Sequence, residues 1–237
     1  MGESFRVGDV LRVACPFTEV RVAGFGYDHV AVEWPWWEVD PDCDWIVWNG
    51  QVALPLDQDG DGGLFRTDPA PGRLRAGEVC RVGIPPTVVQ VIDVAHYDPP
   101  QETGRLPRPR LELVVLPYGE SQHPELEYQG EGLNPGDGIP VAYELLFRPH
   151  AWLVEGDEVA DAAGRAWRFD GPWRWYPFDG VAEEPPSWPL TLLTRDGREP
   201  TPAQAEAVAR ATAAGDHAGE SARWSELTGA TPPPPGR

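Results

Sequence analysis

Residues 8–22 read GDVLRVACPFTEVRV, and residues 77–91 read GEVCRVGIPPTVVQV. Eight of these fifteen aligned positions are identical without a gap. Further matches follow in the same order: Tyr27-Asp28 with Tyr97-Asp98, 52–56 with 114–118, and 64–66 with 146–148. A third, weaker copy begins at Gly156 and extends to WPLTLL at 188–193. Because chance matches do not keep a common order, the sequence predicts an internal duplication.

The repeated stretch alternates apolar and other residues in the manner of a half-buried β-strand. Leu11 and Cys15 share one face of the first copy, and the aligned residues of the second copy are Cys80 and Ile84. Cysteines that exchange with aliphatic residues behave as small buried hydrophobes. We therefore expect Cys15 and Cys80 to be buried and unpaired. The chain has three cysteines and no CxxC motif, which fits a reducing compartment.

The fold class predicted from this repeat is mainly β. We expect two to three tandem small barrels, SH3-like or Tudor-like in architecture, that arose by internal duplication. In the first barrel the pattern predicts five strands separated by Pro- and Gly-containing turns, the first turn at Pro16. Those strands are 8–15, 19–25, 28–34, 46–55 and 63–67. A meander sandwich is the alternative arrangement. The 26 Gly and 28 Pro residues favour many short strands over long helices.

Four segments follow from the repeat boundaries. They are β repeat 1 at 1–72, β repeat 2 at 73–150 with an exposed loop insertion at 119–139, a degenerate β repeat 3 at 151–198, and a helical segment with a Pro-rich tail at 199–237. Thr201, Pro202 and Gln204 form the signature of a capped helix start, and Gly215 is the expected stop. A second short helix is expected at 220–228. The tail, TPPPPGR, is expected to be disordered.

The chain is strongly acidic, with a formal net charge of −19, and all of its cationic side chains are arginine. An acidic surface repels nucleic-acid phosphates and anionic membranes, so we expect neither as a direct partner. The same surface attracts a basic protein, although solubility alone also explains such a charge. The N-terminus has no apolar signal region and no stretch is long enough to span a membrane, which predicts a soluble cytoplasmic protein.

The stretch WPWWEVDPDCDWIVW at 34–48 concentrates aromatic rings among acids. The alternation of Val30, Val32 and Trp34 predicts that Trp34 points inward, which leaves Trp37 on the opposite face. A tryptophan beside an aspartate attracts arginine or lysine. The candidate partner-binding residues are Trp36, Trp37, Trp45, Trp48, Asp40, Asp42, Asp44, Trp173 and Trp175. Packing between the repeat units is the alternative role for these rings.

An acidic loop has the spacing of an EF-hand calcium loop, with Gly62 at the turn position. Its candidate ligands are Asp57, Asp59, Asp61 and Asp68. Two features depart from that pattern, because the flanking segments read as strands and the last ligand is Asp instead of Glu. An ordinary hairpin tip is the alternative, since tight turns also require Asp and Gly.

No nucleophile elbow, phosphate loop, zinc-protease motif or dinucleotide fingerprint is present, and the five histidines are scattered. The sequence therefore favours a non-enzymatic binding protein of the immunity, inhibitor or DNA-mimic type that engages a basic protein through a Trp/Asp surface. One alternative is a small-ligand reader with an aromatic cage for a cationic group or a sugar. Another is an enzyme of unrecognised type.

Overall fold

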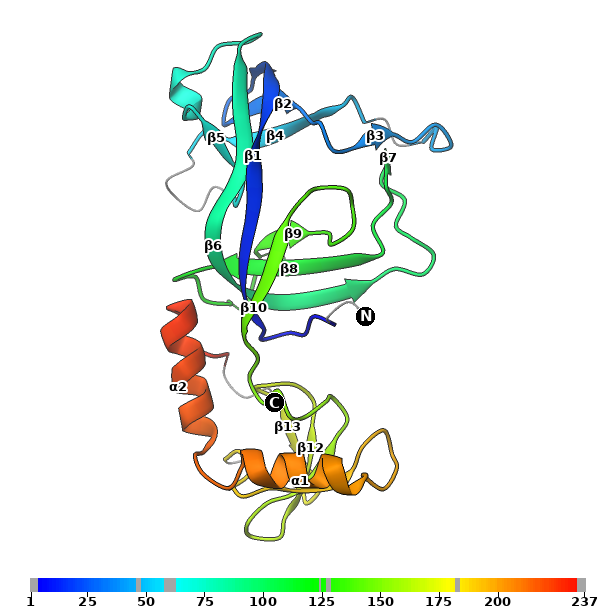
Figure 1. The fold of residues 1–237 in the computed structure, drawn as a ribbon, viewed down its shortest axis with the longest axis vertical. Helices are drawn as coiled ribbons and strands as arrows, with labels where there is room; N and C mark the ends of the chain where they lie inside the picture. Colours follow the sequence, from blue (N-terminus) through cyan, green and yellow to red (C-terminus); the bar gives the residue numbers. More distant parts are fainter. Residues whose placement is uncertain are drawn as a thin grey trace.

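The computed structural model describes residues 4–45, 48–57, 63–123, 125–126, 129–181 and 184–233. The chain is mainly β, with two short helices near its C-terminus (Figure 1). The strands are β1 (Val10–Phe25), β2 (His29–Glu33), β3 (Glu38–Val39), β4 (Gln51–Pro55), β5 (Arg66–Asp68), β6 (Val79–His96), β7 (Arg105–Leu106), β8 (Leu111–Pro117), β9 (Glu131–Leu133), β10 (Ala142–Phe147), β11 (Glu158–Ala160), β12 (Ala166–Phe169), β13 (Trp175–Pro177) and β14 (Thr191–Thr194). A 3-10 turn spans Pro71–Arg73, and the helices are α1 (Pro202–Ala211) and α2 (His217–Thr228).

Two long antiparallel strands, β1 and β6, run through the middle of the N-terminal sheet (Figure 1). The C-terminal half of β1 pairs with β2, which pairs with β4, while the N-terminal half of β6 pairs with β5. The opposite ends repeat this arrangement: β6 pairs with β8, which pairs with β9, and β1 pairs with β10. The sheet therefore has two curled halves that share both long strands.

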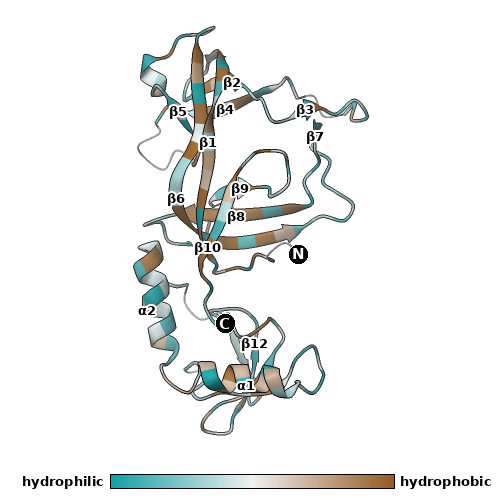
Figure 2. Cartoon of the chain, viewed as in Figure 1, coloured by the Kyte–Doolittle hydropathy of each residue, from teal (hydrophilic) through white to brown (hydrophobic). Residues whose placement is uncertain are grey.

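Each half of this sheet has its own hydrophobic core. One core contains Leu11 from β1 and Val89 from β6, and the other contains Val20 from β1 and Cys80 from β6. Apolar bands along the two long strands mark these contacts (Figure 2). Both cores therefore draw side chains from 1–72 as well as from 73–150, the two units expected from the repeat.

The cysteine prediction is confirmed. Cys15 and Cys80 are each 2% exposed, and both thiols are free. Burial raises the pKa of both thiols above the usual value, because an apolar environment disfavours the thiolate. These residues therefore pack as small apolar side chains.

The predicted turn at Pro16 is wrong, because β1 continues through this residue without reversing. The register between β1 and β6 shifts here, between Cys15 and Thr18. An irregularity of this kind interrupts the ladder of backbone hydrogen bonds, so a residue without an N–H group is tolerated. The segments 8–15 and 19–25 are consequently parts of one strand.

The ladder between β1 and β6 pairs the two sequence repeats symmetrically, so that Leu11 faces Val89 while their aligned counterparts, Cys80 and Val20, also face one another. The facing pairs include Leu11 with Val89, Val20 with Cys80, and Cys15 with its own aligned counterpart Ile84. The sequence match between 52–56 and 114–118 does not correspond to equivalent strand positions in the sheet. Residues 111–117 form β8 directly beside β6, whereas β4 is separated from β1 by β2, so β8 corresponds in position to β2.

The three predicted repeat starts adopt the same turn. Gly8, Gly77 and Gly156 have φ angles of 88°, 84° and 88°. The following acid accepts a hydrogen bond from a backbone N–H three residues before it: Arg6 to Asp9, Arg75 to Glu78 and Val154 to Asp157. Glycine adopts this positive φ without steric cost. The Gly-acid-Val signature therefore specifies a local turn.

The C-terminal part forms a smaller sheet with the order β13-β12-β11-β14. Its core includes Trp167 and Leu192 of the sheet and Val208 of α1. Helix α2 extends from this part to the N-terminal sheet (Figure 1). There Trp224, only 1% exposed, donates its indole hydrogen bond to the carbonyl oxygen of Gly8. The two parts are therefore packed against one another through α2.

The capping box at the start of α1 is confirmed, with reciprocal hydrogen bonds between Thr201 and Gln204. The predicted stop at Gly215 is wrong, because the helix ends at Ala211. Thr212 ends it, since its hydroxyl donates to the Val208 carbonyl and accepts from the Leu190 backbone. No helix in the described part of the chain is long and apolar enough to cross a membrane.

The segment 119–139, predicted as an exposed loop, contributes to the sheet in its second half. It contains β9, in which Leu133 is 4% exposed, and Asp137 is 3% exposed. The many Gly and Pro residues of this segment predicted a surface loop. Three of these glycines, Gly130, Gly136 and Gly138, instead adopt a positive φ in turns on either side of the short strand β9. The disordered Pro-rich tail stays a prediction, because 234–237 lie outside the described residues.

Candidate functional site

The tryptophan-rich segment lies where the chain leaves β2. Trp34 is 5% exposed and packs in the core formed by β2, β4 and the ends of β1 and β6, as the alternation predicts. The Trp36 ring lies 4.7 Å from that of Trp34 and contacts both cores of the N-terminal sheet. Trp36 therefore contributes to the seam between the two halves, the alternative role considered for these rings.

Trp37 does not lie on the face opposite Trp34. Strand β2 ends at Glu33, so the alternation of faces stops before Trp37. The Trp37 ring lies 5.6 Å from the ring of Trp34 and 5.9 Å from that of Trp48. The rings of Trp37 and Trp48 therefore form an aromatic patch, but the patch adjoins the core and is half-buried.

Two arginines from the segment around β7 occupy the patch. The guanidinium carbon of Arg105 lies 3.6 Å from the centre of the Trp37 ring. The guanidinium Nε of Arg108 donates a 2.6 Å hydrogen bond to Asp40, whose side chain is 1% exposed. Strands β3 and β7 pair side by side and hold the two segments together (Figure 1). We call Trp37, Asp40 and these two arginines the arginine clamp.

Asp137 adds a buried carboxylate to the arginine clamp. Its Oδ1 accepts from the backbone of Ile139, while its Oδ2 has no hydrogen-bond partner. Burial raises the pKa of Asp137, and Trp37 and Arg105 partly offset that effect. Gly138 lets this loop approach the tryptophan segment, because φ is 92° and a Cβ would lie 3.0 Å from the Trp36 carbonyl oxygen.

Several buried polar atoms around the arginine clamp have no hydrogen-bond partner among the described residues. Besides Asp137 Oδ2, they are the Nε of Arg105, the Oδ1 of Asn134, and the indole nitrogens of Trp34 and Trp37. Burial lowers the pKa of Arg105, because the guanidinium loses water and the carboxylates of Asp137 and Glu112 offset this loss only partly. The region therefore contains donors and acceptors that the fold does not satisfy within itself.

The remaining predicted partner-binding residues divide between two places. Trp45, 68% exposed, and the exposed Asp42 and Asp44 lie beyond the arginine clamp in the same segment. Trp173 packs instead on Trp224, with ring centres 5.2 Å apart. Trp175 lies in the C-terminal part as well, in contact with two histidines. The candidate tryptophans therefore do not form one shared surface, because Trp173 and Trp175 lie in another part of the fold than Trp37 and Trp45.

A histidine pair forms the second unusual cluster. His150 Nε2 and His217 Nδ1 lie 3.0 Å apart, although 67 positions separate them in the chain. Four aromatic rings surround His150 at centroid distances of 5.6, 5.7, 5.7 and 6.3 Å, those of Trp152, Phe169, Trp175 and Trp188. Burial lowers the pKa of His150 to about 3 and that of His217 to about 4. Both imidazoles are therefore neutral at pH 7.

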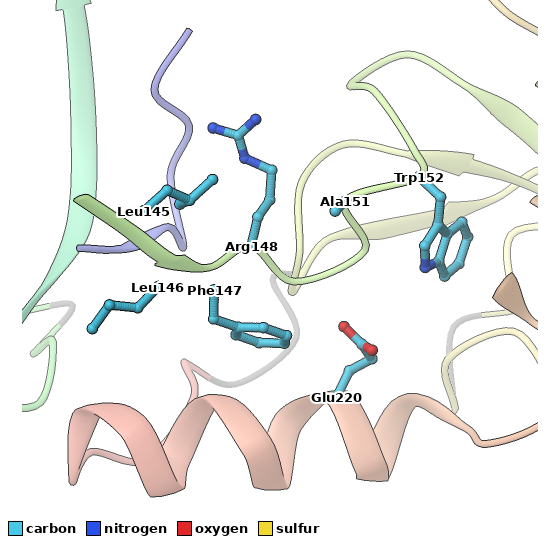
Figure 3. A pocket seen from close by; sticks show the side chains of 7 residues that line it. All are labelled: Leu145, Leu146, Phe147, Arg148, Ala151, Trp152 and Glu220. Carbon is cyan, nitrogen blue, oxygen red and sulfur yellow. The ribbon is translucent and has the colours of Figure 1, made fainter. Parts of the chain in front are cut away.

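A pocket of about 320 Å³ lies between β10 and α2, beside this histidine pair. Figure 3 shows its lining, with Phe147 and Arg148 on one side and Glu220 reaching up from α2. Arg148 is paired with Asp9 at 2.6 Å, and Glu220 accepts the backbone N–H of His150. Both of these charged groups already have intramolecular partners, so the pocket offers a ligand mainly apolar surface.

The predicted calcium loop lies partly outside the described residues, which exclude Asp59 and Asp61. Asp68 belongs to β5, and its carboxylate forms an ion pair with Arg81. Within the described part of the chain, no group of three or more His, Cys, Asp or Glu side chains could hold a metal ion. Calcium binding by Asp57, Asp59, Asp61 and Asp68 stays a prediction.

Comparisons with known proteins identify no relative. The chain matches no family model, and searches of curated proteins and of solved structures also find no match.

The residues that complete both clusters were not among the candidates predicted from the sequence. Arg105, Arg108 and Arg110 lie within six residues of an otherwise acidic chain, so the segment GRLPRPR was a local signal for an internal partner of the acids. For Asp137, His150 and His217 no local signal exists. Their positions depend on contacts between distant segments.

Proposed function

We propose that this chain is an acidic, non-enzymatic binding protein that engages a basic protein partner through the surface around the arginine clamp. The observation that supports this proposal is the occupancy of the site by arginine. Arg105 lies on the ring of Trp37, and Arg108 is ion-paired with Asp40. An aromatic face and a carboxylate are the two groups that bind guanidinium best. The same side chains suit an arginine-bearing partner of the immunity or inhibitor type.

The surface beside the arginine clamp can extend such an interaction. Trp45 is 68% exposed and Val39 is 56% exposed. Glu38, Asp42 and Asp44 are exposed around them. A large exposed ring with flanking acids has the composition of a protein-binding patch that anchors a cationic partner. The overall charge of −19 adds long-range attraction for such a partner.

A charge-matched comparison tests this function. Binding of a fluorescent octa-arginine peptide is measured by anisotropy for the wild type, for Asp42→Asn/Asp44→Asn, and for Glu155→Gln/Glu199→Gln. Both double variants lose two negative charges, but only the first pair lies at the proposed surface. We expect weaker binding only for the first variant, and a steep loss of affinity with added salt. Equal affinities for both variants would contradict a site at this surface.

We further infer that the N-terminal sheet arose by duplication of a small curled β unit of SH3-like type. The bulges of the two hairpins support this inference, since the register shifts between Val22 and Gly24 in one and between the aligned Val91 and Asp93 in the other. In this proposal the duplicated units exchanged halves of β1 and β6. Each curled half would then contain one segment of β1, from the first copy, and one segment of β6, from the second copy.

The small-ligand alternative has less support. The rings around His150 are in contact with the protein's own imidazoles, so they form a packed cluster instead of an open cage. The nearby pocket is lined mainly by apolar side chains, and its Arg148 and Glu220 already have partners in the protein. Neither feature favours a cationic group or a sugar.

A further inference from the structure

We propose that residues 104–110, GRLPRPR, are a built-in substitute for the partner, and that Trp37 and Asp40 of the arginine clamp recognise an Arg-x-x-Arg segment of a basic protein. In this proposal Arg105 and Arg108 occupy the binding site until two partner arginines with the same spacing displace them. The inference rests on the proposed function, because it names the chemistry of the partner at the same surface.

The two arginines are bound by different groups, which defines two subsites. The first is the face of Trp37, 3.6 Å from the guanidinium carbon of Arg105. The second is the carboxylate of Asp40, which accepts from Arg108 at 2.6 Å and from the backbone N–H of Asp42 at 3.0 Å. In the internal segment the two arginines lie three positions apart, with Arg105 in β7 and Arg108 beyond its end, so the two subsites are spaced for an Arg-x-x-Arg segment of this conformation.

The internal segment pairs with the tryptophan-rich segment over a short ladder, and Arg108 is also ion-paired with Glu102 at 2.9 Å. The ladder between β3 and β7 consists of two residue pairs, Glu38 with Leu106 and Val39 with Arg105. This pair of strands forms a sheet of its own, separate from the eight-stranded sheet. Figure 1 shows both strands at the side of the molecule, away from the ladder between β1 and β6. An incoming segment can therefore take the place of β7 without breaking the eight-stranded sheet.

The internal arginine also fits its subsite incompletely. Asp137 is 3% exposed, yet its Oδ2 accepts no hydrogen bond, and the Nε of Arg105 donates none. The Oδ1 of Asn134, in the same loop, is unpaired as well. Buried groups without partners are costly. A partner arginine that donates to Asp137 and Asn134 would satisfy these atoms, which gives it an advantage over Arg105.

Such an advantage is needed because an internal segment competes strongly. A tethered ligand acts at an effective concentration on the order of millimolar. The observed affinity for an external segment falls in proportion to the fraction of molecules in which the site is open. Removing the internal arginines should therefore strengthen binding of an external peptide, the reverse of the usual effect of deleting binding-site residues.

The test uses a labelled peptide with the sequence GRLPRPR and the full-length protein. Its affinity is measured by fluorescence anisotropy for the wild type, for Arg105→Ala/Arg108→Ala, and for the control Arg12→Ala/Arg21→Ala. The two variants have the same net charge, but only the first opens the site. We expect binding at least ~10-fold tighter for the first variant than for the wild type or the control. A peptide with lysine in place of arginine should bind the opened site more weakly, since lysine cannot pair in a bidentate manner.

Equal affinities for the two variants would overturn the inference. The proposed function would still stand if octa-arginine binding depends on Asp42 and Asp44, so the two failures are distinguishable. If Arg105→Ala/Arg108→Ala does not fold, Arg108→Ala alone serves in its place, because it leaves Arg105 on the Trp37 ring. A gain in affinity over Arg12→Ala supports the inference, and the absence of such a gain overturns it.

Discussion

Trp34 is the aromatic residue with the largest expected effect on stability in the tryptophan-rich segment. It is 5% exposed and packs on the rings of Trp36, Trp37 and Phe65. We expect Trp34→Ala to lower the free energy of unfolding by about 3–5 kcal/mol, because it leaves a cavity that its neighbours fill only partly.

Trp45→Ala is the matched control for this change. Trp45 comes from the same segment but is 68% exposed, so its loss should change stability by less than ~0.5 kcal/mol. Urea denaturation followed by circular dichroism measures both variants. Similar losses for both would contradict the assignment of Trp34 to the core.

The histidine pair predicts a loss of stability in mild acid. Burial lowers the pKa of His150 to about 3 and of His217 to about 4, whereas both titrate near 6.5 when unfolded. Below pH 6.5 the unfolded state therefore binds protons that the folded state does not. Stability is fully present above pH 6.5 and falls toward pH 4 by up to ~1.4 kcal/mol per pH unit for each ring.

Chemical denaturation at several pH values between 7 and 4 checks this prediction. His217→Gln should reduce the slope of stability against pH, since it removes one of the two titrating rings. His96→Gln, which removes an exposed histidine, should leave the slope unchanged. A slope that is the same in all three proteins would show that other groups cause the acid sensitivity.

At the scale of single elements, α1 depends on its cap. Thr201 accepts the Gln204 backbone hydrogen bond, and Val208 in the same helix is fully buried in the C-terminal core. Thr201→Ala should lower the free energy of unfolding by about 1 kcal/mol, because a backbone N–H of the first turn loses its acceptor. Thr201→Asp should restore most of this loss. Thermal melting of the wild type and the two variants measures these changes. If Thr201→Ala and Thr201→Asp melt at the same temperature, the side-chain cap does not stabilise α1.

The elements also show which local patterns predict structure. The capping box and the Gly-acid turns depend on residues within four positions of one another, and the capping box predicted where α1 begins. The turn at Pro16 and the stop at Gly215 were predicted with the same local rules and were wrong. In both places a contact with a distant strand, β6 for Pro16 and the Leu190 backbone for Thr212, overrides the local preference.

At the scale of the whole molecule, one buried ion pair joins two segments 139 positions apart in the chain, where β1 begins and β10 ends. Arg148, at the end of β10, forms two hydrogen bonds with Asp9, which is fully buried before β1. Arg148→Ala should cost about 3–5 kcal/mol, because it leaves the Asp9 carboxylate buried without its cation.

Arg12→Ala provides the comparison, since Arg12 also pairs with an acid of β10 but is 46% exposed at its side chain. Its removal should cost no more than ~1 kcal/mol. The midpoints of urea denaturation at low and high salt measure both variants, and only the Arg12 pair should weaken with salt. Equal losses at low salt would contradict the larger contribution assigned to the buried pair.

The sequence by itself determined the β class, the inward face of the repeated strands, the burial of Cys15 and Cys80, and the capped start of α1. These features follow from alternation and from hydrogen bonds between near neighbours, which a single chain segment expresses alone. Only the tertiary structure decided that β1 and β6 each serve two cores, that Arg105 and Arg108 occupy the Trp37 and Asp40 groups, and that His150 meets His217. Those arrangements depend on burying apolar surface and pairing charges between segments far apart in the chain, and no local pattern encodes which distant segment completes them.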